Sequence, residues 1–461
     1  MEEQKSIKTA AEAGWHLSKY NISARLADEG SIIVVNLLKG SCTKLGLADL
    51  VKISDLDRLN EDDPVLKKLS KRGIIVNFDE RALLETMARG ACAYPSAVGL
   101  TISPTLGCNF DCPYCFENHR AEKMSGQVQN DVVHLAERML DASGAKKLSI
   151  NWFGGEPLLA PEIIKSLSER LIKLAEEKKA TYAASIVTNG YLLDQKIADM
   201  LKSSKVSRIQ ITLDGIGAVH DATRHLVGGG QTFVRITENL RNVKISGKVL
   251  IRHNVHQGNK AEAEKLKSYI AKLAEESGND LCYYQAPVID SVTAENRGKQ
   301  VDLLCESEND EVSMTQMLRQ FRPGSGHFCG ANSLWNVGID PLGNLQKCWE
   351  DTDKPEHSFG TAANWDPMNP LFSADHPDWM TVYLNTSGAL DDQECRSCIW
   401  LPACRGGCPN HRLFYKRACV PYKDEPAKFA LAVYRKIQGQ KNPSEVKQES
   451  YPDTVTENAT F

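Results

Sequence analysis

The chain has 461 residues, of which 42% are hydrophobic and 25% charged, an ordinary composition for a globular protein of two or three domains. Its net charge of −4 gives no basic field for nucleic acid and no polybasic membrane anchor, and no apolar run approaches the roughly 20 residues of a membrane span. The first residues, MEEQKSIKTAAEAGWHL, lack the basic-then-apolar order of a secretory signal. We therefore expect a cytoplasmic protein that binds no nucleic acid and no membrane.

Residues 1–95 predict a small module of their own. Residues 19–41 predict a β-hairpin that turns at Asp28-Glu29-Gly30. Residues 63–76 predict a helix followed by a strand, and residues 79–91 predict a second helix.

Residues 96–310 alternate strand-like apolar runs with amphipathic helical segments such as 162–179 and 261–277. The strand candidates are residues 98–102, 147–153, 183–188, 207–213, 248–255 and 281–287. This alternation predicts an α/β fold with a parallel sheet, and six units fit a partial (β/α)6 TIM-like barrel. In barrels of this type the chemistry lies at the carboxyl ends of the strands.

The fourteen cysteines are unevenly distributed. Three lie within residues 108–115 and seven more between residues 329 and 419. In a reducing cytoplasm such groups indicate metal binding rather than disulfides. We interpret the other four as small buried residues. They are Cys42, Cys92, Cys282 and Cys305.

The stretch CNFDCPYC directly follows the first predicted barrel strand and has the spacing C-x3-C-x2-C. Three thiolates in one short loop can hold three irons of a 4Fe–4S cubane and leave the fourth iron without a protein ligand. A structural zinc site is the alternative, because cysteine-rich loops commonly bind zinc.

This spacing, with the aromatic Tyr114 just before the last cysteine, resembles the radical S-adenosylmethionine (radical SAM) superfamily. The resemblance implies that Cys108, Cys112 and Cys115 bind a 4Fe–4S cluster and that Tyr114 lies in the cofactor site. The motif GGEP follows the second strand, as in that family. The resemblance implies that this motif holds the amino group of S-adenosyl-L-methionine. Its residues are Gly154, Gly155, Glu156 and Pro157.

Polar residues follow three further strands. They are Thr188 and Asn189, then Asp214, then Arg252 with Asn254. At the carboxyl ends of parallel strands they suit the ribose hydroxyls and the methionine carboxylate, although each also suits a helix cap or a turn.

Residues 214–233 also match the subgroup of the family that acts on peptides and proteins. That match implies that Asp214, His220 and Arg224 line the approach to the cofactor.

The later cysteines resemble the SPASM extension of radical SAM enzymes, and the predicted SPASM domain spans residues 311–430. The matching pattern begins with Cys329, thirteen residues, Gly343, four residues and Cys348. It continues as C-x2-C-x5-C-x3-C from Cys395, with the last cysteine at position 419. A zinc ribbon would leave three of these seven thiols unexplained.

The SPASM resemblance implies two auxiliary 4Fe–4S clusters, which makes three clusters in total. It assigns the outer cluster to Cys395, Cys398, Cys404 and Cys419, and the inner cluster to Cys329, Cys348 and Cys408. Residues 330–347 lack the extra cysteine of sulfatase-maturing relatives, so the inner cluster has an open iron unless Cys282 or Cys305 reaches it. Residues 431–461 predict a polar tail that stays disordered.

The resemblance implies an enzyme that abstracts a hydrogen atom from a ribosomal precursor peptide and forms a crosslink, with a thioether favoured because of the open iron. Carbon–carbon crosslinking and formylglycine formation are the alternatives. The first module resembles a winged-helix element that holds a peptide leader, and flavodoxin or ferredoxin would supply electrons. Glu350 and Asp351 are interpreted as a solvated surface pair rather than a catalytic base. An iron–sulfur electron carrier and a zinc-binding protein are the non-enzymatic alternatives.

Overall fold

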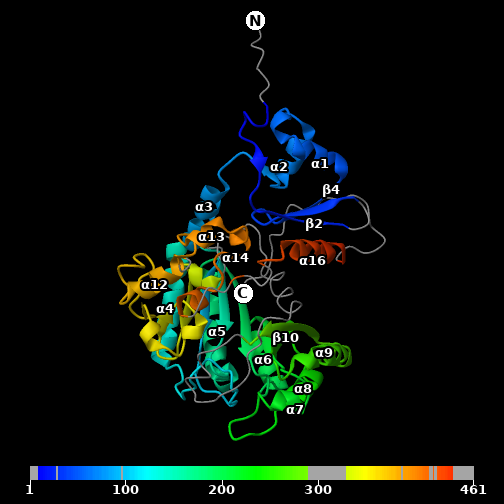
Figure 1. Cartoon of the computed structure of the whole chain (residues 1–461). Helices are drawn as coiled ribbons and strands as arrows, with labels where there is room; N and C mark the ends of the chain where they lie inside the picture. Colours follow the sequence, from blue (N-terminus) through cyan, green and yellow to red (C-terminus); the bar gives the residue numbers. More distant parts are fainter. Residues whose placement is uncertain are drawn as a thin grey trace. The chain divides into compact units, whose positions relative to one another are not determined.

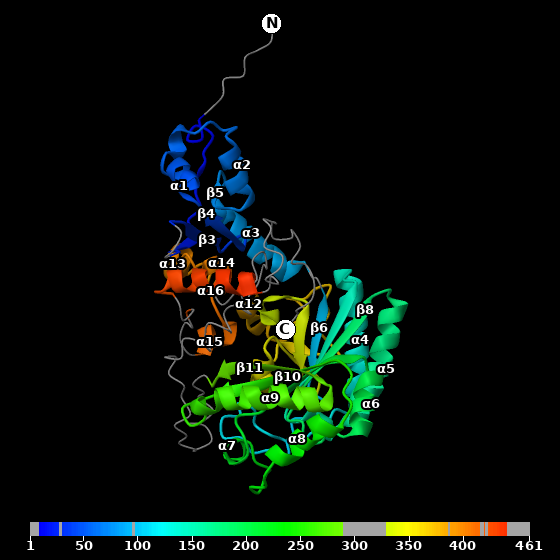
Figure 2. The same ribbon diagram turned by 90° about the vertical axis from the view of Figure 1, so that its right-hand side faces the viewer.

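The computed structural model describes residues 9–26, 30–94, 97–288, 329–385, 388–414, 419 and 423–439. The chain divides into two compact units (Figures 1 and 2). The barrel unit comprises residues 92–313 and 330–385, and the terminal unit comprises residues 1–91, 314–329 and 386–461. The predicted domain boundaries at 95, 310 and 430 follow the sequence motifs and stay a prediction.

The barrel unit contains a nine-stranded sheet in the order β11-β10-β9-β8-β7-β6-β12-β13-β14. Its first six strands are parallel and follow one another in sequence, which confirms the predicted partial α/β barrel. These six strands are β6 (Val98–Ile102), β7 (Lys147–Trp152), β8 (Thr181–Thr188), β9 (Val206–Thr212), β10 (Lys248–Val255) and β11 (Asp280–Pro287).

Helices cover the outer face of this sheet, and Figures 1 and 2 show α4, α5 and α6 running beside the strands. The first of them starts where the Ser125 side chain accepts a hydrogen bond from the Val128 N–H, and it ends at the left-handed Gly144. The helices of this face are α4 (Gly126–Ser143), η2 (Pro157–Leu159), α5 (Pro161–Glu177), α6 (Gln195–Ser203), α7 (Ala218–Asp221), α8 (Phe233–Asn242), η3 (Lys260–Glu262) and α9 (Ala263–Ser277).

The two faces of the parallel strands differ in polarity. Strand β7 buries Leu148, Ile150 and Trp152 beneath the helices, while Ser149 and Asn151 alternate with them and stay partly exposed. Further polar residues share this inner face, and two hydrogen bonds cross it, from Ser185 to Asn151 and from Tyr284 to Gln210. The inner face is therefore partly open and polar, unlike the apolar packed interior of a closed eight-stranded barrel.

Three short strands extend the sheet beyond β6. They are β12 (Asn336–Ile339), β13 (Asn344–Gln346) and β14 (Gly360–Thr361), and β12 pairs in parallel with β6. The turn between β12 and β13 uses Gly343 at φ +87°, and Asp340 accepts hydrogen bonds from the N–H groups of Leu342 and Asn344. This hairpin leads directly to Cys348.

The terminal unit contains an antiparallel sheet in the order β2-β3-β4. The predicted hairpin is the pair β2–β3, whose turn residues Asp28 and Glu29 lie outside the described residues. The comparison with a winged helix stays a prediction. The elements of this part are β1 (His16–Leu17), β2 (Asn21–Arg25), β3 (Ile32–Asn36), β4 (Ser41–Leu45), α1 (Leu47–Ser54), η1 (Leu56–Arg58), α2 (Pro64–Lys71), β5 (Ile75–Val76) and α3 (Glu80–Ala93), whose last two residues belong to the barrel unit.

Helix α16 (Pro426–Gly439) packs against β2 and β3, so residues from both ends of the chain share one core. Within that core the Phe429 ring meets Trp400 edge-on, with ring centroids 5.2 Å apart. The structure thus extends helix into the first nine residues of the predicted polar tail, because Val433 is buried and Leu431 and Ile437 pack against the same core. Residues 440–461 lie outside the described residues.

Short helices make up most of what remains of both units. None of the described helices is long and apolar enough to cross a membrane. These short helices are η4 (Gly330–Asn332), η5 (Trp349–Asp351), η6 (Pro355–His357), α12 (Pro377–Leu384), α13 (Gln393–Ser397), α14 (Leu401–Cys404) and α15 (Pro409–Phe414).

Replacing Phe429 by alanine should destabilise the terminal unit by about 3–5 kcal/mol, because a fully buried aromatic ring is lost from its core. Thermal unfolding followed by circular dichroism measures the effect. Phe372, which is 96% exposed, supplies the matched control, and its replacement by alanine should change little. Equal melting temperatures for Phe429→Ala and wild type would show that α16 is not part of the core.

Candidate functional site

The loop that carries the first three cysteines leaves the carboxyl end of β6 and is held by the segment after α7. The Asp111 N–H donates to the His225 carbonyl at 3.1 Å, and the Val227 N–H donates to the Asn109 carbonyl at 2.9 Å. An isolated antiparallel bridge joins Phe110 to Leu226 between these bonds. A loop without regular structure thereby gains a fixed backbone.

The three thiols lie close to the protein core. Cys112 is 7% exposed, and Cys108 and Cys115 are partly buried against the same core. Burial, Glu156 and Cys112 raise the pKa of the Cys108 thiol to about 12, against the lowering effect of the Phe110 N–H and of Arg224. Burial favours the protonated thiol, whereas a metal binds the thiolate. Metal binding by these cysteines would therefore displace the thiol protons. Among the described residues, no group of three His, Cys, Asp or Glu is arranged around a single ion position.

The GGEP motif packs directly on the chain that leads into this loop. A Cβ atom at Gly154 would lie 2.5 Å from the Thr105 carbonyl oxygen, and one at Gly155 would lie 2.4 Å from the Gly107 carbonyl oxygen. The Glu156 N–H donates to that Gly107 carbonyl at 2.8 Å. The two glycines are therefore required for contact between two backbones, whether or not they also approach a ligand.

Glu156 is fully buried and joins the ends of β7 and β8. Its carboxylate accepts hydrogen bonds from the Thr188 hydroxyl at 2.7 Å, the Asn189 N–H at 2.7 Å and the Leu158 N–H at 2.9 Å. Burial raises the pKa of Glu156, while these three donors lower it. The carboxylate thus acts as a brace between neighbouring strand ends, and its predicted contact with the amino group of a cofactor stays a prediction.

Asn189 connects this brace to the cysteine loop. Its side-chain amide donates to the Asn109 side chain at 2.7 Å and accepts from the Tyr191 N–H at 3.0 Å. Asn189 therefore has the turn contact that the sequence allowed and also supports the cysteine loop, while its predicted contact with the cofactor stays a prediction. Asn109, inside the CNFDCPYC stretch, is a partner that sequence reasoning missed.

Tyr114 is the centre of a second network. Its hydroxyl donates to the Asp214 carboxylate and accepts from Arg224 Nη1 at 2.9 Å and from Asn254 Nδ2 at 3.2 Å. Burial raises the pKa of Tyr114 well above its usual value, with Arg224 acting against it and Asp214 adding to it. The phenol thus stays protonated and joins Asp214 and Asn254, at the ends of β9 and β10, and Arg224, after α7, to the cysteine loop.

Asp214 is fully buried and reaches the loop through Tyr114. Its carboxylate also accepts from the Asn254 N–H at 3.0 Å, and its carbonyl accepts from Asn259 Nδ2 at 2.8 Å. The Asp214 N–H donates to His220 Nδ1 at 3.1 Å. Asn259 was not predicted, since an asparagine after a strand carries no distinctive sequence signal.

Arg224 is a buried cation beside the cysteines. Burial lowers its pKa, but Tyr114, Cys112 and Asp214 together raise that pKa well above the usual value. Its guanidinium carbon lies 5.6 Å from the centroid of the Phe110 ring. The sequence predicted that Arg224 lines the approach to the cofactor without giving it a role. In the structure it lies near enough to Cys112 for a charge interaction and donates to Tyr114.

The residues after Cys348 are less exposed than expected. Asp351 is 1% exposed and accepts hydrogen bonds from the Tyr383 hydroxyl at 2.6 Å and from His357 Nδ1 at 3.0 Å. The interpretation of Glu350 and Asp351 as a solvated surface pair is therefore wrong for Asp351, because the fold surrounds its carboxylate with donors. Burial raises the pKa of Glu350, while Lys354 lowers it.

Two contacts tie the segment after Cys348 to the first cysteine loop. The rings of Phe116, Phe153 and Trp349 form a continuous stack with centroids 6.3 and 5.3 Å apart. The Asp353 carboxylate accepts hydrogen bonds from the Asn118 N–H and side-chain amide at 2.7 and 2.8 Å. Cys348 is thus held in a fixed relation to the loop within the barrel unit.

The other predicted auxiliary ligands lie in the terminal unit. Burial raises the pKa of Cys404 to about 12, and the thiols of Cys395, Cys398 and Cys419 lie near enough to raise it further. The four predicted outer ligands are thus neighbours. Of the inner set, Cys348 lies in the barrel unit, whereas Cys329 and Cys408 lie in the terminal unit. Cys282 is partly buried on β11, and Cys305 lies outside the described residues.

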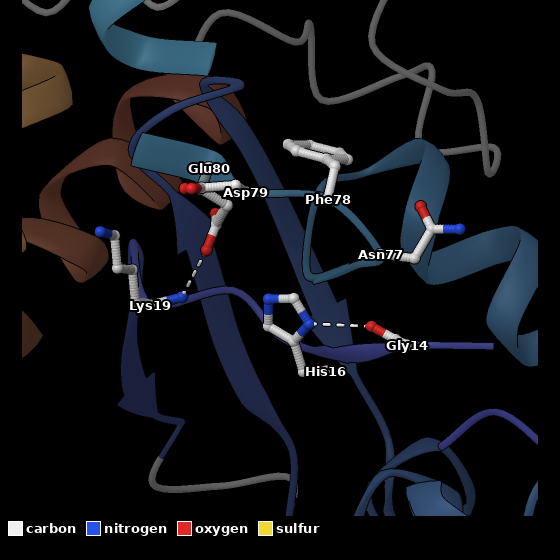
Figure 3. Close-up of a pocket in the computed structure, with 7 residues that line it drawn as sticks. All are labelled: Gly14, His16, Lys19, Asn77, Phe78, Asp79 and Glu80. Carbon is white, nitrogen blue, oxygen red and sulfur yellow. Dashed lines mark hydrogen bonds between the residues drawn. The ribbon is translucent and has the colours of Figure 1, made fainter. Parts of the chain in front are cut away.

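A cavity of about 370 Å³ lies in the terminal unit between β1 and the start of α3 (Figure 3). His16, Lys19, Phe78 and Asp79 are among its lining residues. Glu80, which also lines it, accepts from the Ser18 hydroxyl at 2.5 Å and from the Lys19 N–H at 3.0 Å, and these bonds account for its buried carboxylate. None of the predicted site residues lines this cavity.

Comparison with known proteins defines the class of this barrel. Residues 102–270 match the radical SAM superfamily, so this part of the chain is a radical SAM domain. The cysteine-type anaerobic sulfatase-maturating enzyme of Clostridium perfringens (strain 13 / Type A) is 28% identical over 343 residues, which cover 68% of this chain and 88% of that protein. The GTP 3',8-cyclase of Microcystis aeruginosa is 32% identical over 121 residues, covering 25% of this chain and 34% of that protein.

A solved structure described as native anSMEcpe with bound AdoMet and Cp18Cys peptide has a TM-score of 0.54 at 20% identity. It covers 74% of this chain and 98% of the other, and at that identity it supports the fold. The chain spans about a third to a half of the length of the first curated relatives it matches.

His220 should make stability depend on pH. Burial, then Arg224 and His253, lower its pKa well below 6.5, so the unfolded chain binds a proton more readily than the folded one. Stability should therefore be full above about pH 6.5 and fall on acidification by up to roughly 1.4 kcal/mol per pH unit until the lowered pKa is reached. Denaturant unfolding at pH 7.5 and 5.5 measures the loss. His220→Asn should lose less, and equal losses would contradict the prediction.

Proposed function

We propose that this chain is a radical SAM enzyme that modifies a peptide. The observation that supports this most is the position of the CNFDCPYC loop, at the carboxyl end of β6 with the ends of β7 to β10 hydrogen-bonded around it. Carboxyl ends of parallel strands are where barrel enzymes carry out their chemistry. The buried thiols and the adjacent cation Arg224 fit a cluster whose ligands are thiolates.

In this proposal Cys108, Cys112 and Cys115 hold a 4Fe–4S cluster with one open iron. When bound there, the cluster and S-adenosyl-L-methionine supply a 5′-deoxyadenosyl radical that removes a hydrogen atom from a carbon of the substrate. The protein orients the nucleoside and excludes water. The predicted cofactor contacts are Tyr114, Gly154, Gly155, Glu156, Pro157, Thr188, Asn189, Asp214 and Arg252.

These predicted contacts differ in exposure, and we assign them different roles on that basis. Arg252 is partly exposed on the inner face, where its Nε donates to Asn254 Oδ1 at 2.6 Å. A partly exposed guanidinium suits a carboxylate ligand. Glu156 and Asp214 are fully buried, so their contribution is to hold Thr188, Asn189 and Tyr114 in place.

We further propose the two auxiliary 4Fe–4S clusters, which makes three in all. The proximity of Cys395, Cys398 and Cys419 to Cys404 supports the outer site. Cys329, Cys348 and Cys408 would hold the inner cluster, with an open iron because residues 330–347 contain no cysteine.

The proposed substrate is a ribosomal precursor peptide, in line with the bound peptide that the anSMEcpe structure is described as holding. Bonding of the substrate carbon radical to a cysteine sulfur would release the thiol proton and one electron, which the auxiliary clusters would accept, and would give a thioether, the favoured product. The terminal unit would hold the leader, a flavodoxin or ferredoxin would donate electrons, and the reaction would take place in the cytoplasm.

Formylglycine formation is the second candidate. The 28% identity to the clostridial sulfatase-maturating enzyme, over 88% of its length, favours it. Mass spectrometry distinguishes the products of a cysteine-containing peptide. A thioether crosslink lowers the mass by two hydrogens, whereas formylglycine formation removes the sulfur and two hydrogens and adds one oxygen.

Replacing Cys112 by alanine should abolish cleavage of S-adenosyl-L-methionine, because one of three cluster ligands is removed. Chromatographic assay of 5′-deoxyadenosine after anaerobic reconstitution and dithionite reduction measures the loss. Cys42→Ala is a matched control in the other unit and should keep full activity. Undiminished 5′-deoxyadenosine from the Cys112 variant would refute the core assignment.

Iron analysis should give about twelve irons per chain, with equal acid-labile sulfide, if three cubanes are present. Cys404→Ala should lose about four of these irons and retain reductive cleavage of S-adenosyl-L-methionine, since the outer site lies in the other unit. A protein that binds only zinc and has no visible absorption would contradict every cluster assignment.

A further inference from the structure

Arg405 immediately follows Cys404 and is 6% exposed. Its Nε, Nη1 and Nη2 atoms have no hydrogen-bond partner in the part of the chain that the structure describes. A buried guanidinium without an acceptor is strongly unfavourable, because the charge has lost its hydration and gained nothing in return. The position therefore calls for an anionic group that is not a side chain of the described residues.

The backbone around Arg405 is unusual as well. Arg405 has φ +50°, and Gly406 and Gly407 follow at +90° and +79°. A side chain in the left-handed region is disfavoured, and such a conformation is retained where the surroundings require it. Here it closes the short connection between Cys404 and Cys408.

Burial lowers the pKa of Arg405 to about 10, and the nearby Cys404 and Tyr20 act against that lowering. Tyr20 is 1% exposed, and among the described residues its hydroxyl also lacks a hydrogen-bond partner. Cys404 in turn neighbours Cys395, Cys398 and Cys419. Two unsatisfied polar groups thus lie in or next to the core that contains Cys395, Cys398 and Cys404 of the proposed outer cluster.

Arg412 provides a contrast within the same unit. Its Nη1 donates to the Cys395 sulfur at 3.4 Å, while its Nη2 donates to the Asp392 carboxylate at 2.7 Å. The charge of Arg412 is therefore balanced by a carboxylate, and that of Arg405 is not.

We propose that Arg405 is the buried counter-charge of the outer auxiliary cluster and sets its reduction potential. This inference rests on the proposed function, which places a 4Fe–4S cluster on Cys395, Cys398, Cys404 and Cys419. A cubane held by four thiolates is anionic and gains one more negative charge when it takes up an electron. A nearby buried cation stabilises the reduced form more than the oxidised form, which raises the potential.

The experiment is a redox titration of the reconstituted full-length protein with dithionite, followed by electron paramagnetic resonance, with Cys404→Ala identifying the signal of the outer cluster. Arg405→Gln should shift the equilibrium toward the oxidised cluster on the order of tenfold, a fall of about 59 mV for one electron. Arg405→Lys keeps the charge and should show a smaller fall. Arg396→Gln removes an exposed charge next to Cys395 and should leave the potential unchanged.

An Arg405→Gln protein with full iron content and the wild-type potential would overturn the inference. If Arg405→Gln loses about four irons per chain while Arg405→Lys retains them, the need for the charge is supported. Equal iron loss in both variants would instead show that the residue acts through packing, and would also overturn it. If Cys404→Ala removes no signal from the wild-type spectrum, the outer cluster of the proposed function is refuted, which is a separate failure.

Discussion

The site depends on the close approach of two backbones at the carboxyl edge of the barrel sheet. Gly154 and Gly155 leave no room for a side chain against the carbonyls of Thr105 and Gly107, and the Glu156 N–H fixes that contact. This contact brings the end of β7 against the start of the cysteine loop. Every other group of the site, from the brace at Glu156 to the thiols, is placed relative to this junction.

Two buried hydrogen-bond networks then extend the junction across the mouth of the barrel. Glu156 joins β7 to β8, while Tyr114 and Asp214 join the cysteine loop to β9 and β10. Buried hydrogen bonds of this kind restrict the movement of the strand ends that they join. The mouth therefore presents a preformed arrangement in which the fully buried carboxylates position residues that are nearer the open inner face.

The terminal unit holds its cysteines in a different way. Its cysteine loop lies in a core to which both ends of the chain contribute residues. Tyr20 lies just before β2 and Ile33 lies in β3, while Trp400 and Phe429 come from far later in the sequence. Local patterns predicted a hairpin near the start and a cysteine motif near the end, but not that the two would share a core. Burial of Phe429 also explains why helix continues into residues that looked too polar to fold.

The sequence by itself determined the six parallel strands, through alternating apolar runs, and the cysteine and glycine motifs, through their spacing. Only the tertiary structure decided what the polar residues do. It made Glu156 a brace, buried Asp351 among donors, gathered Asn109 and Asn259 into the site, and left Arg405 without an acceptor. The physical reason is that strand periodicity and ligand spacing are local, whereas the partner of a buried polar group comes from wherever the fold brings the chain back.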